Sequence, residues 1–472
     1  MHKSKPLQIL KNFSVWELKD LEKFIGSEFY SGNEVLLHVF KTLKKDHPKF
    51  ESPSLEKEKL FKKLFPSEPY EESKLRYIFS DLAKLIEEFI VLKELNTDPI
   101  RKKLLLLDYY RRNDLEKYFN QVFEDSVKTQ LKDGVKDADW FFNQYLLEEK
   151  AYIYSQHQKS RSLDNNLQTL VNYLDLFYIT NKLKHSGEML TREMLLKVTY
   201  NKPMLDTIIG YVSSGKFEGY TAVEIYHCIV MMHTSPDDEQ YYKKLLALLE
   251  IHAAEFTKEE LVDMYVFAQN YCTNRINSGQ AEYLGEIFNL YKKMIDLGAI
   301  YENGYVRPNV FKNIVTVGIR LEEFEWIEGF IHDYKEKLDP KTRDNAINYN
   351  MAWLEYARKE YKKALRHLST ADMMDIFYQL GAKCLLLKIY YETQDIDAFY
   401  ALTESFYVYL RRNNLIADFQ KEAHLNFIKY IKQLMKLRLE RDKKGAKKLR
   451  DELAETKNIL DLSWFLKKLD EI

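Results

Sequence analysis

The chain has 472 residues, with 71 lysines and arginines against 72 aspartates and glutamates, so its formal net charge is −1. This balance leaves no net electrostatic field that would attract nucleic acid or an anionic membrane. Apolar residues make up 46% of the chain, which is enough for a continuous core, and 15 glycines and 10 prolines are few for a protein rich in β-structure. The composition therefore favours a helical protein with neither a nucleic-acid nor a membrane partner.

The cysteines and the apolar runs indicate where the chain works. Cys228, Cys272 and Cys384 are far apart and odd in number, and no C-x-x-C pair is present, so neither a disulfide framework nor a zinc site is expected. The first residues lack the apolar run of a signal peptide. The longest apolar runs, such as residues 104–107, are too short to cross a bilayer. We therefore expect a soluble cytoplasmic protein.

Residues 1–95 are expected to form an N-terminal helical cap region. Ser14 is followed three residues later by Glu17, the spacing of a capping box that opens an amphipathic helix. Residues 57–92 also resemble the two helices of the winged-helix domain in bacterial transcriptional activators. No alternating segment follows them to make a wing. Residues 1–138 hold 26 basic and 24 acidic residues, a net charge of +2, whereas nucleic-acid modules usually carry a clear basic face.

Residues 96–308 read as a degenerate helical-repeat region. Apolar residues recur at helical spacing in successive segments, among them 165–184, 221–234 and 258–274. The segment 280–297 ends at Gly298, which suits a left-handed helix C-cap. No long segment shows the strict alternation of a half-buried strand, so we expect helices throughout.

Residues 309–410 carry the clearest repeats. The second helix of each unit begins at a bulky side chain, and the step is 37 residues from Phe324 to Tyr361 and 35 residues from Tyr361 to Ile396. A self-similar unit of about 34 residues is typical of a helix–turn–helix solenoid, in which each pair buries its apolar face against its neighbours. We therefore expect an all-α fold, an α-solenoid of stacked antiparallel helix pairs.

This stretch resembles the tetratricopeptide repeat family. The resemblance lies in Met351-Ala352, Tyr356, Tyr361 and Ala364, and in Pro340 after the preceding unit. The chain departs from the family pattern at four positions. Lys359 stands where the family prefers glycine, and Glu355 stands where it prefers tyrosine. Ile327 stands at the small-residue position of the first repeat, and Ala398 takes that position in the third repeat, one residue early.

The resemblance implies that the first helix of each pair lines a concave groove that binds a protein or peptide. Tyr349, Trp353 and Tyr356 are spaced i, i+4 and i+7, so they share one helix face. They either anchor a partner or pack between neighbouring repeats. The groove positions carried over from the family are Lys312, Thr316, Arg320, Tyr349, Trp353, Tyr356, Lys388 and Tyr391.

Residues 411–472 change character. Between Lys432 and Lys457 there are 10 basic and 5 acidic residues, which is either a solvated helix face or a site for an acidic partner. The candidate basic face is Lys443, Lys444, Lys447 and Lys448. Leu460 to Leu469 then form a short apolar helix, which either caps the last repeat or docks into another chain.

No constellation of side chains indicates catalysis. The segment 210–217 is one residue short of a phosphate-binding loop and has Phe217 where a Mg²⁺-binding serine or threonine is needed. His227 and His233 are six residues apart and do not share a helix face. We therefore expect no enzymatic activity, no cofactor and no metal. The leading hypothesis is a protein- or peptide-binding scaffold, and the alternative is a DNA-binding transcriptional regulator that uses the N-terminal helices with a repeat-built sensor region.

Overall fold

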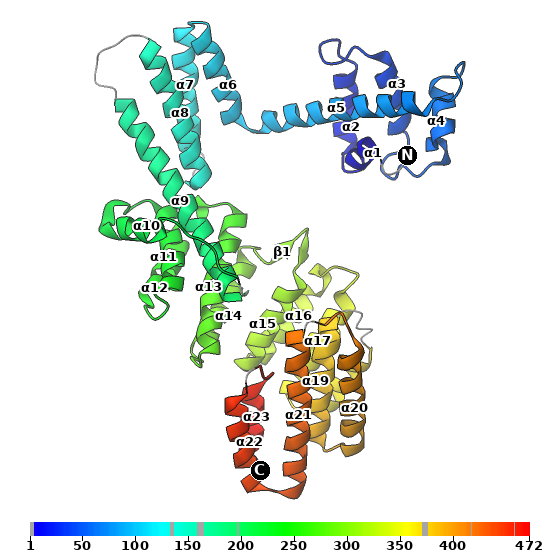
Figure 1. Cartoon of the computed structure of the whole chain (residues 1–472), viewed down its shortest axis with the longest axis vertical. Helices are drawn as coiled ribbons and strands as arrows, with labels where there is room; N and C mark the ends of the chain where they lie inside the picture. The colour runs from blue at the N-terminus through cyan, green and yellow to red at the C-terminus, as the bar shows by residue number, and fades with distance from the viewer. Residues whose placement is uncertain are drawn as a thin grey trace. The chain divides into compact units, whose positions relative to one another are not determined.

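A computed structural model describes residues 4–132, 136–157, 165–195, 198–370, 376–416, 418–456 and 458–472. Over these residues the chain forms 23 α-helices and one two-stranded hairpin, so the predicted all-α class is confirmed (Figure 1). The chain divides into two compact units, Met1–Asn181 and Lys182–Ile472, and the division falls within helix α9.

The first unit begins with short helices packed around a long one. Helices α1 to α4 each contact α5, and their core includes Leu21, Phe40, Phe61 and Leu82. The five helices are α1 (Lys5–Leu10), α2 (Val15–Ile25), α3 (Glu34–Lys44), α4 (Lys57–Leu64) and α5 (Glu72–Thr97), with a short 3-10 turn at Pro53–Leu55.

The predicted capping box at the start of α2 is confirmed. The backbone N–H of Glu17 donates to the Ser14 hydroxyl, and the Glu17 carboxylate accepts from the Ser14 backbone N–H. Residues 57–92 form α4 and most of α5, and residues 4–132 contain no β-strand. The stretch that resembles a winged helix is therefore followed by more helix and not by a wing.

The rest of the first unit is a second helical cluster. Helix α6 packs against α7 and α8, with Leu107, Phe119 and Leu147 fully or nearly fully buried between them. The helices are α6 (Pro99–Arg112), α7 (Glu116–Lys132), α8 (Ala138–His157) and α9 (Asn165–Leu195).

The second unit begins with the end of α9 and with α10, and two helical hairpins follow, α11 with α12 and α13 with α14. The segment that partly resembles a phosphate-binding loop begins at the end of helix α10, not after a strand. It passes through a π-helical turn, Val212–Lys216, where Gly215 has a φ of 83°. The helices are α10 (Leu205–Tyr211), α11 (Thr221–Thr234), α12 (Gln240–His252), a 3-10 turn at Ala253–Glu255, α13 (Lys258–Asn277) and α14 (Tyr283–Asp296).

A small hairpin follows α14, contrary to the expectation of helices throughout. Strands β1 (Tyr301–Glu302) and β2 (Tyr305–Val306) pair antiparallel around Asn303 and Gly304, whose φ values are 51° and 83°. Two-residue hairpin turns need positive φ, and Asn-Gly is their strongest sequence signal. Each strand is too short to show alternation, so the turn was the only signal available. The left-handed C-cap predicted at Gly298 is confirmed by its φ of 61°.

The remaining helices form successive contacting pairs. In each pair the first helix also contacts the first helix of the next pair, so α15, α17, α19 and α21 are neighbours in order. The helices are α15 (Pro308–Arg320), α16 (Phe324–Tyr334) with a 3-10 turn at Lys335–Lys337, α17 (Arg343–Ala357), α18 (Tyr361–Thr370), α19 (Ile376–Thr393), α20 (Ile396–Arg412), α21 (Asp418–Glu440), α22 (Lys443–Glu455) and α23 (Leu462–Asp470). Helices α16, α18 and α20 begin at the residues whose spacing defined the repeat.

The turn inside each pair has one repeated geometry. The residue two positions before the second helix has a φ between 51° and 64° at Glu322, Lys359, Gln394 and Arg441. The next residue donates its backbone N–H to the carbonyl five residues earlier, at 2.8–3.0 Å in all four turns. This is the hydrogen bond of a Schellman motif, in which glycine is usual at the left-handed position. The chain therefore has a charged or amide side chain at a left-handed position where glycine is usual.

The helices of a pair approach closely at small residues. Ala364 is fully buried, as predicted for the contact between α17 and α18. In the pair of α15 with α16, Ile327 takes the equivalent position. Gly318 makes room for it, because a Cβ on Gly318 would lie 2.3 Å from the Ile327 Cδ1 atom. The predicted alignment of the third unit is wrong. Counted from the start of α20, the equivalent residue is Phe399, which is fully buried, and not Ala398.

Candidate functional site

Helix α23 lies on a surface made by the first helices of three successive pairs. Its side chains contact residues of α17, α19 and α21 that lie 35 to 108 positions earlier in the sequence. We call this surface the α17–α19–α21 face. It consists of Trp353, Tyr356, Lys388, Tyr391, Glu392, Phe427 and Tyr430.

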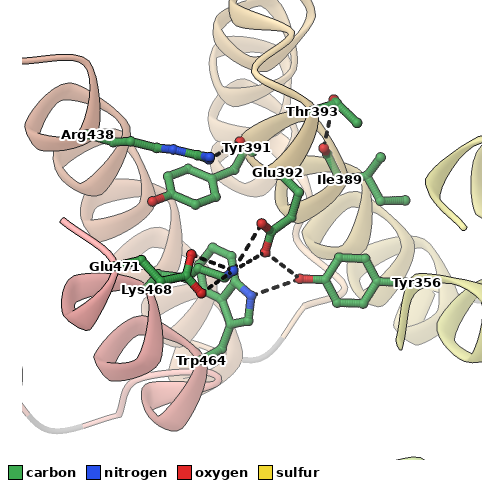
Figure 2. Close-up of polar contacts among 9 residues, drawn as sticks. All are labelled: Tyr356, Ile389, Tyr391, Glu392, Thr393, Arg438, Trp464, Lys468 and Glu471. Carbon is green, nitrogen blue, oxygen red and sulfur yellow. Dashed lines mark hydrogen bonds and ion pairs between the residues drawn. The ribbon is translucent and has the colours of Figure 1, made fainter. Parts of the chain in front are cut away.

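The central contact is made by Trp464. Its indole nitrogen donates to the hydroxyl of Tyr356 on α17 at 2.8 Å, and its ring packs edge-on against Tyr391 on α19, with ring centroids 5.4 Å apart (Figure 2). The Tyr356 hydroxyl in turn donates to the Glu392 carboxylate at 3.4 Å. Burial, together with the charge of Glu392, raises the pKa of Tyr356, so this hydroxyl stays a neutral donor and acceptor.

An ion pair lies beside this contact. The Lys468 ammonium is 2.8 Å from one Glu392 carboxylate oxygen and 3.0 Å from the other, and it also pairs with Glu471 at 2.8 Å (Figure 2). The side chains of Lys468 and Glu392 are only 12% and 10% exposed. Burial lowers the pKa of Lys468, but the hydrogen bonds to the two carboxylates outweigh burial and the net pKa is raised. A pair this shielded is screened much less by salt than an exposed one.

A buried lysine completes the polar contacts. The Lys388 side chain on α19 is 3% exposed and pairs with Asp461, just before α23, at 2.7 Å. Its ammonium also lies 5.1 Å from the ring centroids of both Trp353 and Trp464, within the range of a cation–π contact. This charge is therefore stabilised by one carboxylate and two indole rings. Two of these three partners, Asp461 and Trp464, are contributed by the C-terminal segment.

The adjacent side of α23 is apolar. Phe465 is fully buried and packs edge-on against Phe427 on α21, with ring centroids 5.5 Å apart, and Leu469 is 5% exposed in the same core. Arg450 on α22 pairs with Asp470. Helix α23 therefore has two faces. The apolar face covers α21 and α22, and the polar face, formed by Asp461, Trp464 and Lys468, contacts α17 and α19.

The structure separates the predicted groove residues into three groups. Trp353, Tyr356, Lys388 and Tyr391 meet under α23. Tyr349 is instead a packing residue, 3% exposed, against Tyr378 and Gly381 on α19. The groove positions of the first repeat pair lie on α15. Thr316 and Arg320 are exposed there, and the Lys312 ammonium lies 5.5 Å from the Tyr349 ring centroid.

The four lysines of the predicted basic face, Lys443, Lys444, Lys447 and Lys448, are all exposed on α22. The other side of that helix buries Ala446, Leu449 and Leu453. The histidines weighed as metal ligands are separate, because His227 contacts Ser213 and His233 contacts Thr191. Across the described residues no group of three or more metal-ligating side chains is present.

Sequence reasoning missed Glu392, Asp461, Trp464 and Lys468 as site residues. The first directly follows Tyr391. Trp464 and Lys468 lie on the apolar C-terminal helix, and Asp461 directly precedes it, at positions i+3, i+7 and i. This helical spacing was visible in the sequence. What they face was not visible, because it lies far away in the chain.

The comparisons with known proteins name no relative. The chain matches no family model, no curated protein and no solved structure. Among the helices of the described residues, none has the length and apolar character needed to cross a membrane. The features that bear on function are therefore the α17–α19–α21 face and the helix pairs that build it.

Proposed function

We propose that the chain is a non-enzymatic scaffold that binds a protein or peptide, built as a solenoid of tetratricopeptide-like helix pairs. The observation that carries the proposal is the seating of α23, because the first helices of the repeats already hold an amphipathic helix there. The four identical turns from Glu322 to Arg441 support the repeat, since one turn geometry gives one pair geometry.

The chemistry of the face suits peptide recognition. Tyr356, Tyr391 and Trp353 supply rigid aromatic surface, and aromatic residues dominate the binding energy of interfaces. Glu392 and Lys388 supply one charge of each sign, which fixes the orientation of a bound segment. Laying an amphipathic helix in a groove is one of the recurring modes of peptide recognition.

Two further features bear on the alternatives. The DNA-binding hypothesis depends on residues 57–92. Leu60, Phe61 and Leu75 are buried there in the core of the N-terminal helices, and no wing follows, which does not favour DNA binding. The three cysteines are buried and free, which supports the reducing environment of the cytoplasm as the site of action.

The test is site-specific photo-crosslinking in cells that express the full chain. A photoreactive amino acid at Thr316, exposed on the first helix α15, should capture a defined protein. The same amino acid at Lys362, exposed on the second helix α18, should not. If both positions capture the same set of proteins, or if Thr316 captures none, the scaffold proposal is wrong.

A further inference from the structure

We infer that α23 occupies in cis a site for a partner helix, and that this partner presents an acidic residue, an aromatic residue three positions later and a lysine four positions after that. The inference rests on the proposed function and specifies the partner's chemistry. The pattern is that of Asp461, Trp464 and Lys468, which meet Lys388, Tyr356 and Glu392 respectively.

The two faces of α23 have different roles. Phe465 and Leu469 cover the apolar core of α21 and α22, as a cap requires. A cap needs no contact with α17, yet Trp464 reaches Tyr356 there through a hydrogen bond of 2.8 Å. The polar face thus adds recognition to the capping contact, and it can be removed by substitution while the capping side chains stay in place.

Helix α23 is weak as an isolated element. It has nine residues, and helices shorter than about 12 residues are marginal in water without tertiary support. It also lacks a side-chain N-cap, because the carboxylate of Asp461 is paired with Lys388 and not with the first turn of the helix. Its helical state therefore depends on the face beneath it, and a better-formed partner helix has an advantage there.

Charge makes the site selective. Without α23, the Glu392 carboxylate and the Lys388 ammonium would face solvent with no ionic partner from that helix. A helix with its acidic and basic residues exchanged would set like charges against both, which costs binding. The aromatic residue between them supplies the second ring beside the Lys388 ammonium and donates the hydrogen bond to the Tyr356 hydroxyl.

The tether sets how strongly α23 competes. A segment joined by a short linker acts at an effective concentration of about 1 mM, so a partner in solution must bind well to displace it. The apparent Kd for the partner equals the intrinsic Kd divided by the fraction of chains whose face is free. Weakening the polar face of α23 in cis therefore tightens binding in trans.

The experiment titrates a fluorescein-labelled peptide with the sequence of residues 458–472 into the full chain, followed by fluorescence anisotropy. The Trp464→Ala/Lys468→Ala chain should bind it about tenfold tighter, or more, than the wild-type chain. A Leu462→Ala/Lys467→Ala chain, changed on exposed positions of the same helix, should match the wild type. Adding Glu392→Lys to the first variant should abolish the gain, and a Lys468→Glu peptide should restore it.

Equal affinity of the wild-type and Trp464→Ala/Lys468→Ala chains, or a gain that survives Glu392→Lys, would overturn the inference. If the double variant loses helicity by circular dichroism, Lys468→Ala is compared with Lys467→Ala under the same criteria. The proposed function fails separately. A partner that still crosslinks at Thr316 while the peptide result is negative leaves the scaffold standing and removes only the assigned partner chemistry.

Discussion

The indole nitrogen of Trp464 donates a hydrogen bond of 2.8 Å to the hydroxyl of Tyr356, 108 residues earlier in the chain. The same hydroxyl donates to Glu392 at 3.4 Å, so one oxygen joins α17, α19 and α23. This bond ties the last helix to the face that the repeats build.

Removing that hydroxyl isolates a partly buried donor. Tyr356→Phe should lower the free energy of unfolding by about 1–3 kcal/mol, because the indole N–H loses its acceptor in a site that water enters poorly. Tyr407→Phe, on an exposed ring of α20, should change it by less than about 0.5 kcal/mol. Thermal and urea unfolding of both variants measure this. Equal stabilities of the Tyr356→Phe and Tyr407→Phe proteins would show that the hydrogen bond does not stabilise the fold.

Local features of the fold could be predicted from the sequence. The starts of α16, α18 and α20 follow from the spacing of Phe324, Tyr361 and Ile396, because a repeat places a bulky side chain at the same position in each pair. The capping box at Ser14 and the C-cap at Gly298 also follow from a few adjacent residues. The two caps are decided within one turn of chain, and the helix starts are decided by a pattern that recurs along the chain.

The site itself could be predicted only in part. Four of the eight groove positions meet under α23, but the sequence near Lys388 or Tyr391 does not indicate that Asp461 and Trp464 cover them. Contacts between residues 73 or more positions apart leave no periodicity to read. Tyr349 was one member of an aromatic stripe, and its burial is decided by Gly381, a residue on another helix.

The close approach at Gly381 can be tested by adding one methyl group. A Cβ there would lie 2.3 Å from the Tyr349 hydroxyl oxygen. Gly381→Ala should therefore destabilise the protein by about 1–3 kcal/mol despite the better helix propensity of alanine. Adding Tyr349→Phe removes the clashing oxygen and should recover part of the loss. Thermal unfolding of the single and double variants checks this, and a stabilised Gly381→Ala protein would show that α17 and α19 are not so close.

At the left-handed turn at Lys359, glycine is expected to be tolerated or stabilising. Its φ of 64° costs an L-residue about 1–2 kcal/mol, against about 0.5–1 kcal/mol of extra backbone entropy for glycine. Lys359→Gly should leave stability unchanged or raise it by up to about 1 kcal/mol, whereas Lys359→Val should lower it by about 1 kcal/mol or more. Lys362→Gly, inside α18, should cost about 0.5–1 kcal/mol. Equal losses for the two glycine variants would contradict the turn geometry.

The N-terminal capping box predicts a pH dependence. The hydrogen bond from Lys93, followed by those from Ser14, lowers the pKa of Glu17 from 4.5 to about 2. Because the folded pKa is depressed, this stabilisation is present above pH 4.5 and is lost as the pH falls toward 2. The difference in melting temperature between wild type and Glu17→Gln should therefore shrink from pH 6 to pH 2.5. A constant difference across this range would mean that the carboxylate contributes no ionic stabilisation.

The most direct test of the central claim is amide hydrogen exchange of α23 in the full chain. If the α17–α19–α21 face holds this helix through Glu392, then Glu392→Lys sets a like charge against Lys468 and releases it. The amides of residues 462–470 should then exchange about tenfold faster or more, while those of α20 keep their wild-type rates. Asp397→Lys, an exposed charge change on α20, is the matched control and should leave α23 protected. Unchanged exchange of α23 in the Glu392→Lys chain would contradict the account.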